Sequence, residues 1–374
     1  MKMDVENADI KCCTWSSRHM NHNYKVDLIK LFACFLIMST HLFIIGIGHI
    51  GQKDYPFATA WIYVEVFFII SGYFTTQHFS QKDRSDTTLE RASICAVSYT
   101  RKKYFRLFPY VCCVTFVQLT VYAIHNAITN PGQFGLHEIV SLYKKLPVDI
   151  LLLNSARAYD VFPDVAPLWY LSAMIIVFPV FCLLIQMKSE SFLRILSIII
   201  PIIYYGKYGV NADRTYPNDL LRGFVDLMIG TFVYYTSEEL RKRERGRGRA
   251  KERIIFSIIE IVTFLLPVIV TYKNYDMLED TLIIIVIHLV IVFSGVSFCI
   301  KEGKGISKIS ALSLPIYMWH WVVGTALSTI PSFNLLPTVY KLICYYGVTL
   351  VVSIISAKIF PCIACKKLEC EKEV

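Results

Sequence analysis

Long runs of apolar residues, separated by short polar stretches, recur along the whole chain. Most of these runs are close to the roughly 20 residues that a helix needs to cross the hydrocarbon core of a bilayer. The pattern therefore predicts an all-α, polytopic integral membrane protein of about ten transmembrane helices with no soluble domain. The predicted spans are 26–48, 57–79, 107–126, 167–187, 191–206, 219–236, 254–272, 279–300, 308–330 and 338–360.

The composition agrees with this pattern. Hydrophobic residues make up 55% of the chain and charged residues only 18%, which is too apolar for a soluble domain. The net charge of +9 comes from basic residues between the apolar runs, so it indicates contact with a lipid bilayer and no nucleic acid. With the N-terminus inside, roughly 25 of the Lys and Arg residues are cytoplasmic and roughly 7 external. We therefore expect cytoplasmic termini, at 1–25 and 361–374.

The first apolar run, 26–48, carries three ionisable residues. On a helix, Lys30 and His41 would lie within about 20° of each other and roughly 16 Å apart along the axis. Asp27 falls on nearly the same stripe. Ionisable side chains at membrane depth are costly, so this stripe predicts a functional site.

The twelve cysteines indicate neither a disulfide framework nor a metal site. Several lie within apolar runs, where cysteine behaves as a small hydrophobic residue. Cys362 and Cys365 form a C-x-x-C pair near the end of the chain, but no second ligand pair follows, and no metal is expected.

Six short motifs lie in or beside the apolar runs. They are Asp27 with Lys30-x10-His41, Glu65-Val-Phe-Phe-Ile-Ile-Ser71-Gly, Lys103-Tyr-Phe-Arg106, Pro167-Leu-Trp169-Tyr-Leu, Arg222-x-Phe224 with Gly230, and Ile316-Tyr-Met-Trp-His320. In type and in order, they resemble the motifs of the acyltransferase-3 family of integral-membrane acyltransferases.

The resemblance implies an acyltransferase-3 transmembrane domain over 26–360. It also implies a location in the cell membrane, and we expect this to be a bacterial cytoplasmic membrane. It implies an enzyme that moves an acetyl or other short acyl group from acyl-CoA, acetyl-CoA in the simplest case, to a sugar hydroxyl. The acceptor would be a cell-surface or exported glycan or glycolipid, such as a polysaccharide or lipopolysaccharide.

The sequence departs from the family pattern in two places. Lys30 replaces the commoner arginine and keeps the charge without its bidentate fork. Ala173 and Met174 occupy a region where one large branch has an acidic residue. The chain therefore resembles the branch of stand-alone polysaccharide and oligosaccharide O-acetyltransferases.

Acyl transfer from a thioester to a hydroxyl needs a base, and histidine suits that task near neutral pH. His41 is the predicted base, acting by direct transfer or through an acyl-histidine. Glu65 is a second predicted catalytic residue because its carboxylate could orient the imidazole. Pairing of Glu65 with Lys30, or a hydrogen bond between helices, are the alternatives.

Coenzyme A carries phosphates, so its site requires positive charge on the cytoplasmic side. Lys103 and Arg106, at i and i+3, are predicted to bind it, together with Arg101 and Lys30. Lys30 could also pair with Asp27, and both interactions can hold at once.

Four further residues are predicted to contact the acceptor. Ser71 offers a hydroxyl, Trp169 an aromatic face, and Arg222 a charge that could also pair with Asp226. His320, between two tryptophans, is the fourth, with a structural role as its alternative.

A rival hypothesis is a proton-coupled secondary transporter. Asp27, Lys30, Glu65 and His41 would then form a proton relay. Such a fold commonly shows an inverted repeat, and the sequence shows none.

Overall fold

The structure is a computed structural model, and it describes residues 23–81, 88–130, 135–156, 165–210, 218–245, 250–298, 306 and 309–370. Throughout these ranges the secondary structure is helical, with no strand. The α-helices are α2 (Tyr24–Thr40), α3 (Tyr63–Ser80), α4 (Leu89–Thr129), α5 (Leu136–Tyr143), α6 (Leu146–Ile150), α7 (Leu168–Met187), α8 (Glu190–Tyr208), α9 (Asn218–Arg245), α10 (Ala250–Tyr272), α11 (Leu278–Ser294), α13 (Ser313–Ser328), α14 (Pro331–Asn334) and α15 (Thr338–Cys370). Short 3-10 helices are η1 (Leu42–Ile45), η2 (Ala60–Ile62) and η3 (Asn154–Ala156).

Each predicted span overlaps one of the long helices, so the prediction of an all-α fold is confirmed for the described residues. Among the residues that the structure describes, four of these helices are long and apolar enough to cross a membrane, judged by length and composition. They are α4, α7, α10 and the 338–360 part of α15. The number of spans and the orientation of the termini stay predictions.

Two helices differ in extent from the spans predicted over them. Helix α2 ends at Thr40, well before the end of the predicted span 26–48. The chain continues after His41 as the 3-10 helix η1, which ends at Gly46 with a left-handed φ of 72°. Helix α4 begins at Leu89 instead of 107 and is 41 residues long. The basic motif Lys103-Tyr-Phe-Arg106, which precedes the predicted span, therefore lies inside the helix.

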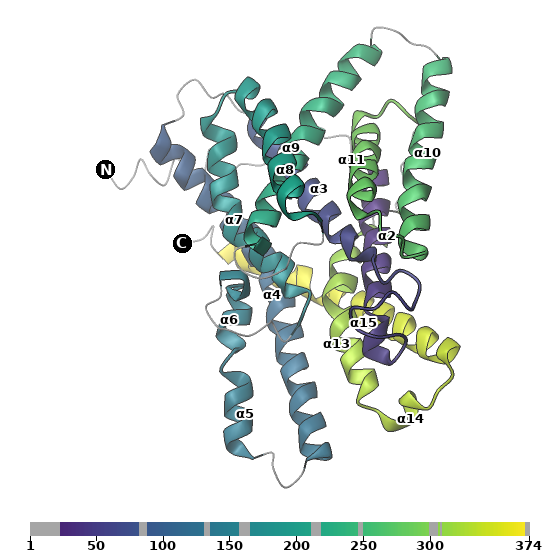
Figure 1. The fold of residues 1–374 in the computed structure, drawn as a ribbon. Coiled ribbons are helices and arrows are strands. Elements are labelled where there is room, and N and C mark those ends of the chain that lie inside the picture. The colour runs from purple at the N-terminus through teal and green to yellow at the C-terminus, as the bar shows by residue number, and fades with distance from the viewer. Residues whose placement is uncertain are drawn as a thin grey trace.

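Helices α3 and α9 cross at the centre of the molecule, with α10 on one side and α4 on the other (Figure 1). The crossing is close because glycines from both helices meet. A Cβ atom at Gly72 would lie 2.2 Å from the Leu227 carbonyl oxygen, and one at Gly230 would lie 2.2 Å from that of Ile69. Small residues of this kind let membrane helices pack backbone against backbone.

Helix α10 presents a different surface from the central pair. Its isoleucine and leucine side chains are largely exposed, among them Ile254, Ile258 and Leu265. On an isolated soluble protein such a patch would be unfavourable. On a membrane helix it is the face that lipid covers.

Candidate active site

His41 stands at the end of α2, as the residue that caps the helix. Its backbone N–H bonds to the Met38 carbonyl, three residues back, so the last turn is tightened. The Ile37 carbonyl lies 2.9 Å from the Nδ1 atom of the His41 side chain. The ring is therefore held against its own helix end, where the helix dipole favours positive charge.

A second histidine meets His41 from α13. The Nε2 atom of His320 lies 3.2 Å from the Nδ1 atom of His41, and the ring centroids are 5.1 Å apart. His320 is completely buried, whereas His41 is half-buried. Trp321 covers one side of His41 with its ring edge-on at 5.2 Å. We call His41 and His320 the histidine pair.

The predicted contact between Glu65 and His41 is replaced by another one. Glu65 forms an ion pair with Arg222, and both side chains are buried. Asp226, one turn beyond Arg222, lies beside Glu65 and accepts a hydrogen bond of 2.6 Å from the Tyr205 hydroxyl. We call Glu65, Arg222, Asp226 and Tyr205 the carboxylate–arginine cluster.

The three charged residues of the carboxylate–arginine cluster are buried, whereas Tyr205 is partly exposed. The Arg222 guanidinium lies 5.0 Å from the centre of the Trp61 ring, a cation–π distance. The predicted ion-pair partner of Arg222 was Asp226, and the structure pairs Arg222 with Glu65. Whether Glu65 has a catalytic role stays a prediction.

Three of the four predicted CoA-binding residues lie near one another. Lys30, on α2, and Lys103 and Arg106, on α4, are close enough for their charges to repel. Lys30 also lies 3.6 Å from an oxygen of Asp27, so the predicted pairing exists. We call Lys30, Lys103 and Arg106 the cation cluster.

The members of the cation cluster differ in exposure. The ammonium group of Lys103 points inward and lies 3.9 Å from the centre of the Phe178 ring. Arg106 and the fourth predicted residue, Arg101, are exposed on α4. Mutual repulsion of partly buried cations is reduced when an anion binds, so the charges fit a polyphosphate such as that of CoA.

Ser71 and Trp169 lie in the interior. The Ser71 hydroxyl interacts with that of Tyr170, and Ser71 is only partly exposed. Trp169 is 7% exposed and packs against Phe68 with centroids 6.4 Å apart. Its carbonyl accepts a hydrogen bond from Ser155. Neither residue presents an open face to an acceptor here, and their substrate role stays a prediction.

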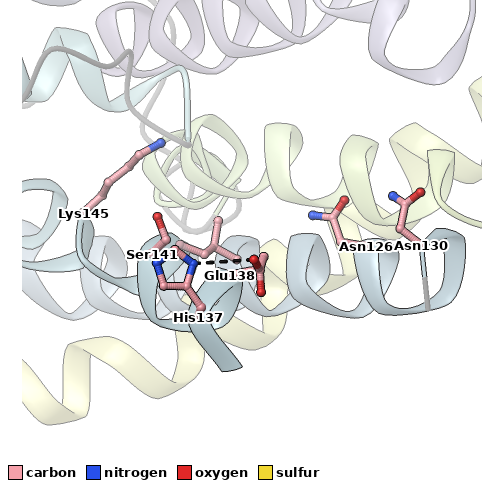
Figure 2. Close-up of a pocket in the computed structure, with 7 residues that line it drawn as sticks. Asn126, Asn130, His137, Glu138, Ser141 and Lys145 are labelled. Carbon is pink, nitrogen blue, oxygen red and sulfur yellow. Dashed lines mark ion pairs between the residues drawn. The ribbon is translucent and has the colours of Figure 1, made fainter. Parts of the chain in front are cut away.

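A polar groove of about 510 Å³ lies elsewhere, between the end of α4 and helix α5 (Figure 2). Amide, carboxylate, hydroxyl and ammonium groups line it, and a His137 nitrogen lies 3.5 Å from Glu138. None of the predicted site residues takes part. The lining residues are Asn126, Asn130, His137, Glu138, Ser141, Leu142 and Lys145.

Sequence reasoning missed two features of the site. The contact between His41 and His320 joins residues 279 positions apart, and no spacing rule indicates it. Tyr205 was missed because it ends an apolar run, where a tyrosine is ordinary. Among the described residues no group of three His, Cys, Asp or Glu side chains could hold a metal ion.

The comparison with protein families decides the identity of the chain. The profile of the acyltransferase domain called acyltransferase 3 matches residues 23–358. The chain belongs to this family. It is therefore a membrane acyltransferase, and its apolar helices agree with that. No curated protein and no solved structure matches it.

Proposed function

We propose that this acyltransferase 3 protein transfers an acetyl or other short acyl group from acyl-CoA to a hydroxyl of a glycan or glycolipid. His41 is the general base. The observation that carries the proposal is the hydrogen bond of the His41 Nδ1 atom to the Ile37 carbonyl, 2.9 Å long. A carbonyl only accepts, so Nδ1 carries the hydrogen and Nε2 carries the lone pair that a base needs.

The chemical step is balanced within the two substrates. The acceptor oxygen forms a bond to the acyl carbon, and the bond between that carbon and the CoA sulfur breaks. The hydroxyl proton passes to His41 Nε2 and from there to the leaving thiolate, which gives CoA with a free thiol. The end of α2 supports the positive charge that His41 carries between these transfers.

The cation cluster supports a CoA site at the other end of the same helix. Lys30 and His41 are roughly 16 Å apart along α2, so the phosphates can remain at the cations while the pantetheine arm runs along the helix. In this arrangement Lys103 and Arg106 hold the phosphates, and the thioester reaches His41. The acceptor is presented in or beyond the bilayer.

The proton-relay alternative gains no support from the contacts. Glu65 pairs with Arg222 on α9, whereas His41 contacts His320 on α13. The two ionisable residues thus belong to separate clusters. A transporter would also yield no covalent product, which makes the alternatives separable by experiment.

The test is transfer of radiolabelled acetyl from acetyl-CoA to membrane glycans by the native protein, His41→Ala and His288→Ala at equal expression. His288 is another buried histidine, bonded to Thr263 at 3.2 Å, and serves as the matched control. We expect label with the native protein and the control, and a loss of about 100-fold or more with His41→Ala. Equal label with all three would remove His41 from the chemistry.

A further inference from the structure

His320 points a ring nitrogen at the predicted base from the inside of the protein. The Nδ1 atom of His320 lies 3.2 Å from the carbonyl of Ile316, one turn back on α13. Because this carbonyl only accepts, Nδ1 of His320 carries hydrogen, and its Nε2 atom is the acceptor. That nitrogen lies 3.2 Å from Nδ1 of His41. The two rings therefore have matching tautomers: His41 donates and His320 accepts.

The donated hydrogen of His41 is shared by two acceptors, the Ile37 carbonyl at 2.9 Å and His320 at 3.2 Å. Both acceptors favour the same tautomer, with hydrogen on Nδ1. The second acceptor also fixes the rotation of the ring, which a single bond to the helix end leaves adjustable. This is the geometry in which a base is oriented by a third group.

The two helices that carry the pair are fastened to each other and to α7. The Cys34 thiol on α2 donates to the Ser313 carbonyl on α13 at 3.0 Å. The Tyr317 hydroxyl on α13 donates to the Pro167 carbonyl before α7 at 2.9 Å. His320 is thereby presented on a supported helix, as preorganised catalytic geometry requires.

We infer that His320 is a positioning residue that holds His41 in the tautomer and orientation of a base. The inference rests on the proposed function of His41. During transfer, His320 accepts the hydrogen bond from Nδ1 of His41 and neither gains nor loses a proton. The hydroxyl proton follows the route already described, through Nε2 of His41 to the thiolate.

Three substitutions separate positioning from packing. In His320→Gln the amide oxygen can accept the hydrogen bond from His41, and the amide N–H can still donate to the Ile316 carbonyl. The asparagine of His320→Asn is one methylene shorter than glutamine. Its amide can donate to the Ile316 carbonyl, but it does not reach His41. His320→Phe fills the volume and accepts nothing. For each variant, kcat and KM for acetyl-CoA are measured in purified full-length protein, together with its thermal midpoint.

We expect His320→Gln to keep kcat within about fivefold of the native value. His320→Asn and His320→Phe should lose about 100-fold in kcat, with KM changed less than about twofold. Adding His320→Phe to His41→Ala should cause no further loss, because the two side chains act as one unit. His288→Gln is the matched control and should behave as the native protein.

Two results would overturn the inference, and they differ from failure of the proposed function. Native kcat in His320→Phe would show that the acceptor is dispensable. Equal kcat in His320→Gln and His320→Asn would do the same, and this comparison decides the matter if the phenylalanine variant does not fold. If His41→Ala itself transfers label at the native rate, the proposed base is wrong, and the positioning role is lost with it.

Discussion

The histidine pair and the carboxylate–arginine cluster are both polar and both lie between helices, yet they differ in charge and exposure. The pair joins His41, half-buried at a helix end, to the buried His320 through one shared hydrogen bond. The cluster places an ion pair between Glu65 and Arg222 in the middle of the fold, with almost no exposed surface.

The difference agrees with the proposed function, in which the histidine pair takes part in the reaction and the cluster stabilises the fold. A base has to meet a substrate and exchange a proton, so partial exposure and a neutral ring suit it. A fully buried ion pair does not readily exchange protons, because neutralising either partner leaves an uncompensated charge in the interior. The cluster also lies across α3 and α9, whose backbones touch at Gly72 and Gly230. We therefore interpret the cluster as a polar contact that holds α3 and α9 together where they cross.

The largest effect should come from breaking the cluster. Arg222→Met leaves Glu65 and Asp226 buried side by side without a cation, and should lower the free energy of unfolding by about 3–5 kcal/mol. His41→Ala removes hydrogen bonds from a half-buried residue and should cost about 1 kcal/mol. Denaturant titration in detergent measures both.

A neutralised background is the control for that comparison. Glu65→Gln with Asp226→Asn removes both carboxylates, so adding Arg222→Met should then cost far less than in the native protein. If Arg222→Met alone is as stable as His41→Ala, the cluster does not hold α3 to α9, and the contrast between the two regions fails.

An intermediate effect should come from the helix crossing itself. In Gly230→Ala the new Cβ atom would lie 2.2 Å from the Ile69 carbonyl oxygen, so α3 and α9 must separate, at about 1–3 kcal/mol. Gly206→Ala on α8 is the control, because nothing lies within 4 Å of its Cβ position. It should stabilise the helix by about 0.5–1 kcal/mol. Equal thermal midpoints for the two variants would contradict a close crossing.

The smallest effect should come from the loop that follows η1, where His49 contacts Asp54. His49 bonds the Asp54 carboxylate at 2.5 Å and holds the pKa of Asp54 below its usual value. A depressed pKa means that the interaction stabilises the fold above the ordinary aspartate range and is lost as the pH falls through the lowered value.

Asp54→Asn should therefore lower the thermal midpoint slightly at pH 7 and leave it unchanged in strong acid, where the native carboxyl is also protonated. Both midpoints are measured by a thermal-shift assay in detergent. Because the interaction between His49 and Asp54 is exposed to solvent, the effect should be much smaller than that of Arg222→Met. A larger loss in acid than at pH 7 would contradict the assignment.

Apolar periodicity predicted the positions of the long helices because burial in lipid leaves a strong one-dimensional signal. It did not locate the end of α2, because the apolar run continues beyond Thr40 as the 3-10 helix η1 and hydropathy does not distinguish the two kinds of helix. Motif spacing selected a set of polar residues as a predicted site, and their roles stay predictions. It did not predict that Glu65 meets Arg222, because that contact depends on how α3 crosses α9.

In the cation cluster, too, the sequence predicted the local structure but not the contacts between helices. The i, i+3 spacing of Lys103 and Arg106 required a helix, and α4 supplies one. Nothing in that spacing indicated that Lys103 turns inward onto Phe178 while Arg106 stays exposed. The covered sides of α4 depend on the helices that pack against it, α7 and α13 among them, which lie elsewhere in the sequence.

Helix α4 runs without a break over 89–129. At 1.5 Å per residue it is roughly 60 Å long, about twice the thickness of the hydrocarbon core. Pro109, which lacks a backbone N–H, lies between Lys103 of the cation cluster and Asn126 of the polar groove. A tilt of about 3° at that point displaces the Thr129 end by roughly 1.5 Å, about three times the displacement at Lys103. The same small tilt at Pro109 would therefore move the end of the helix at the polar groove much further than it moves the cations.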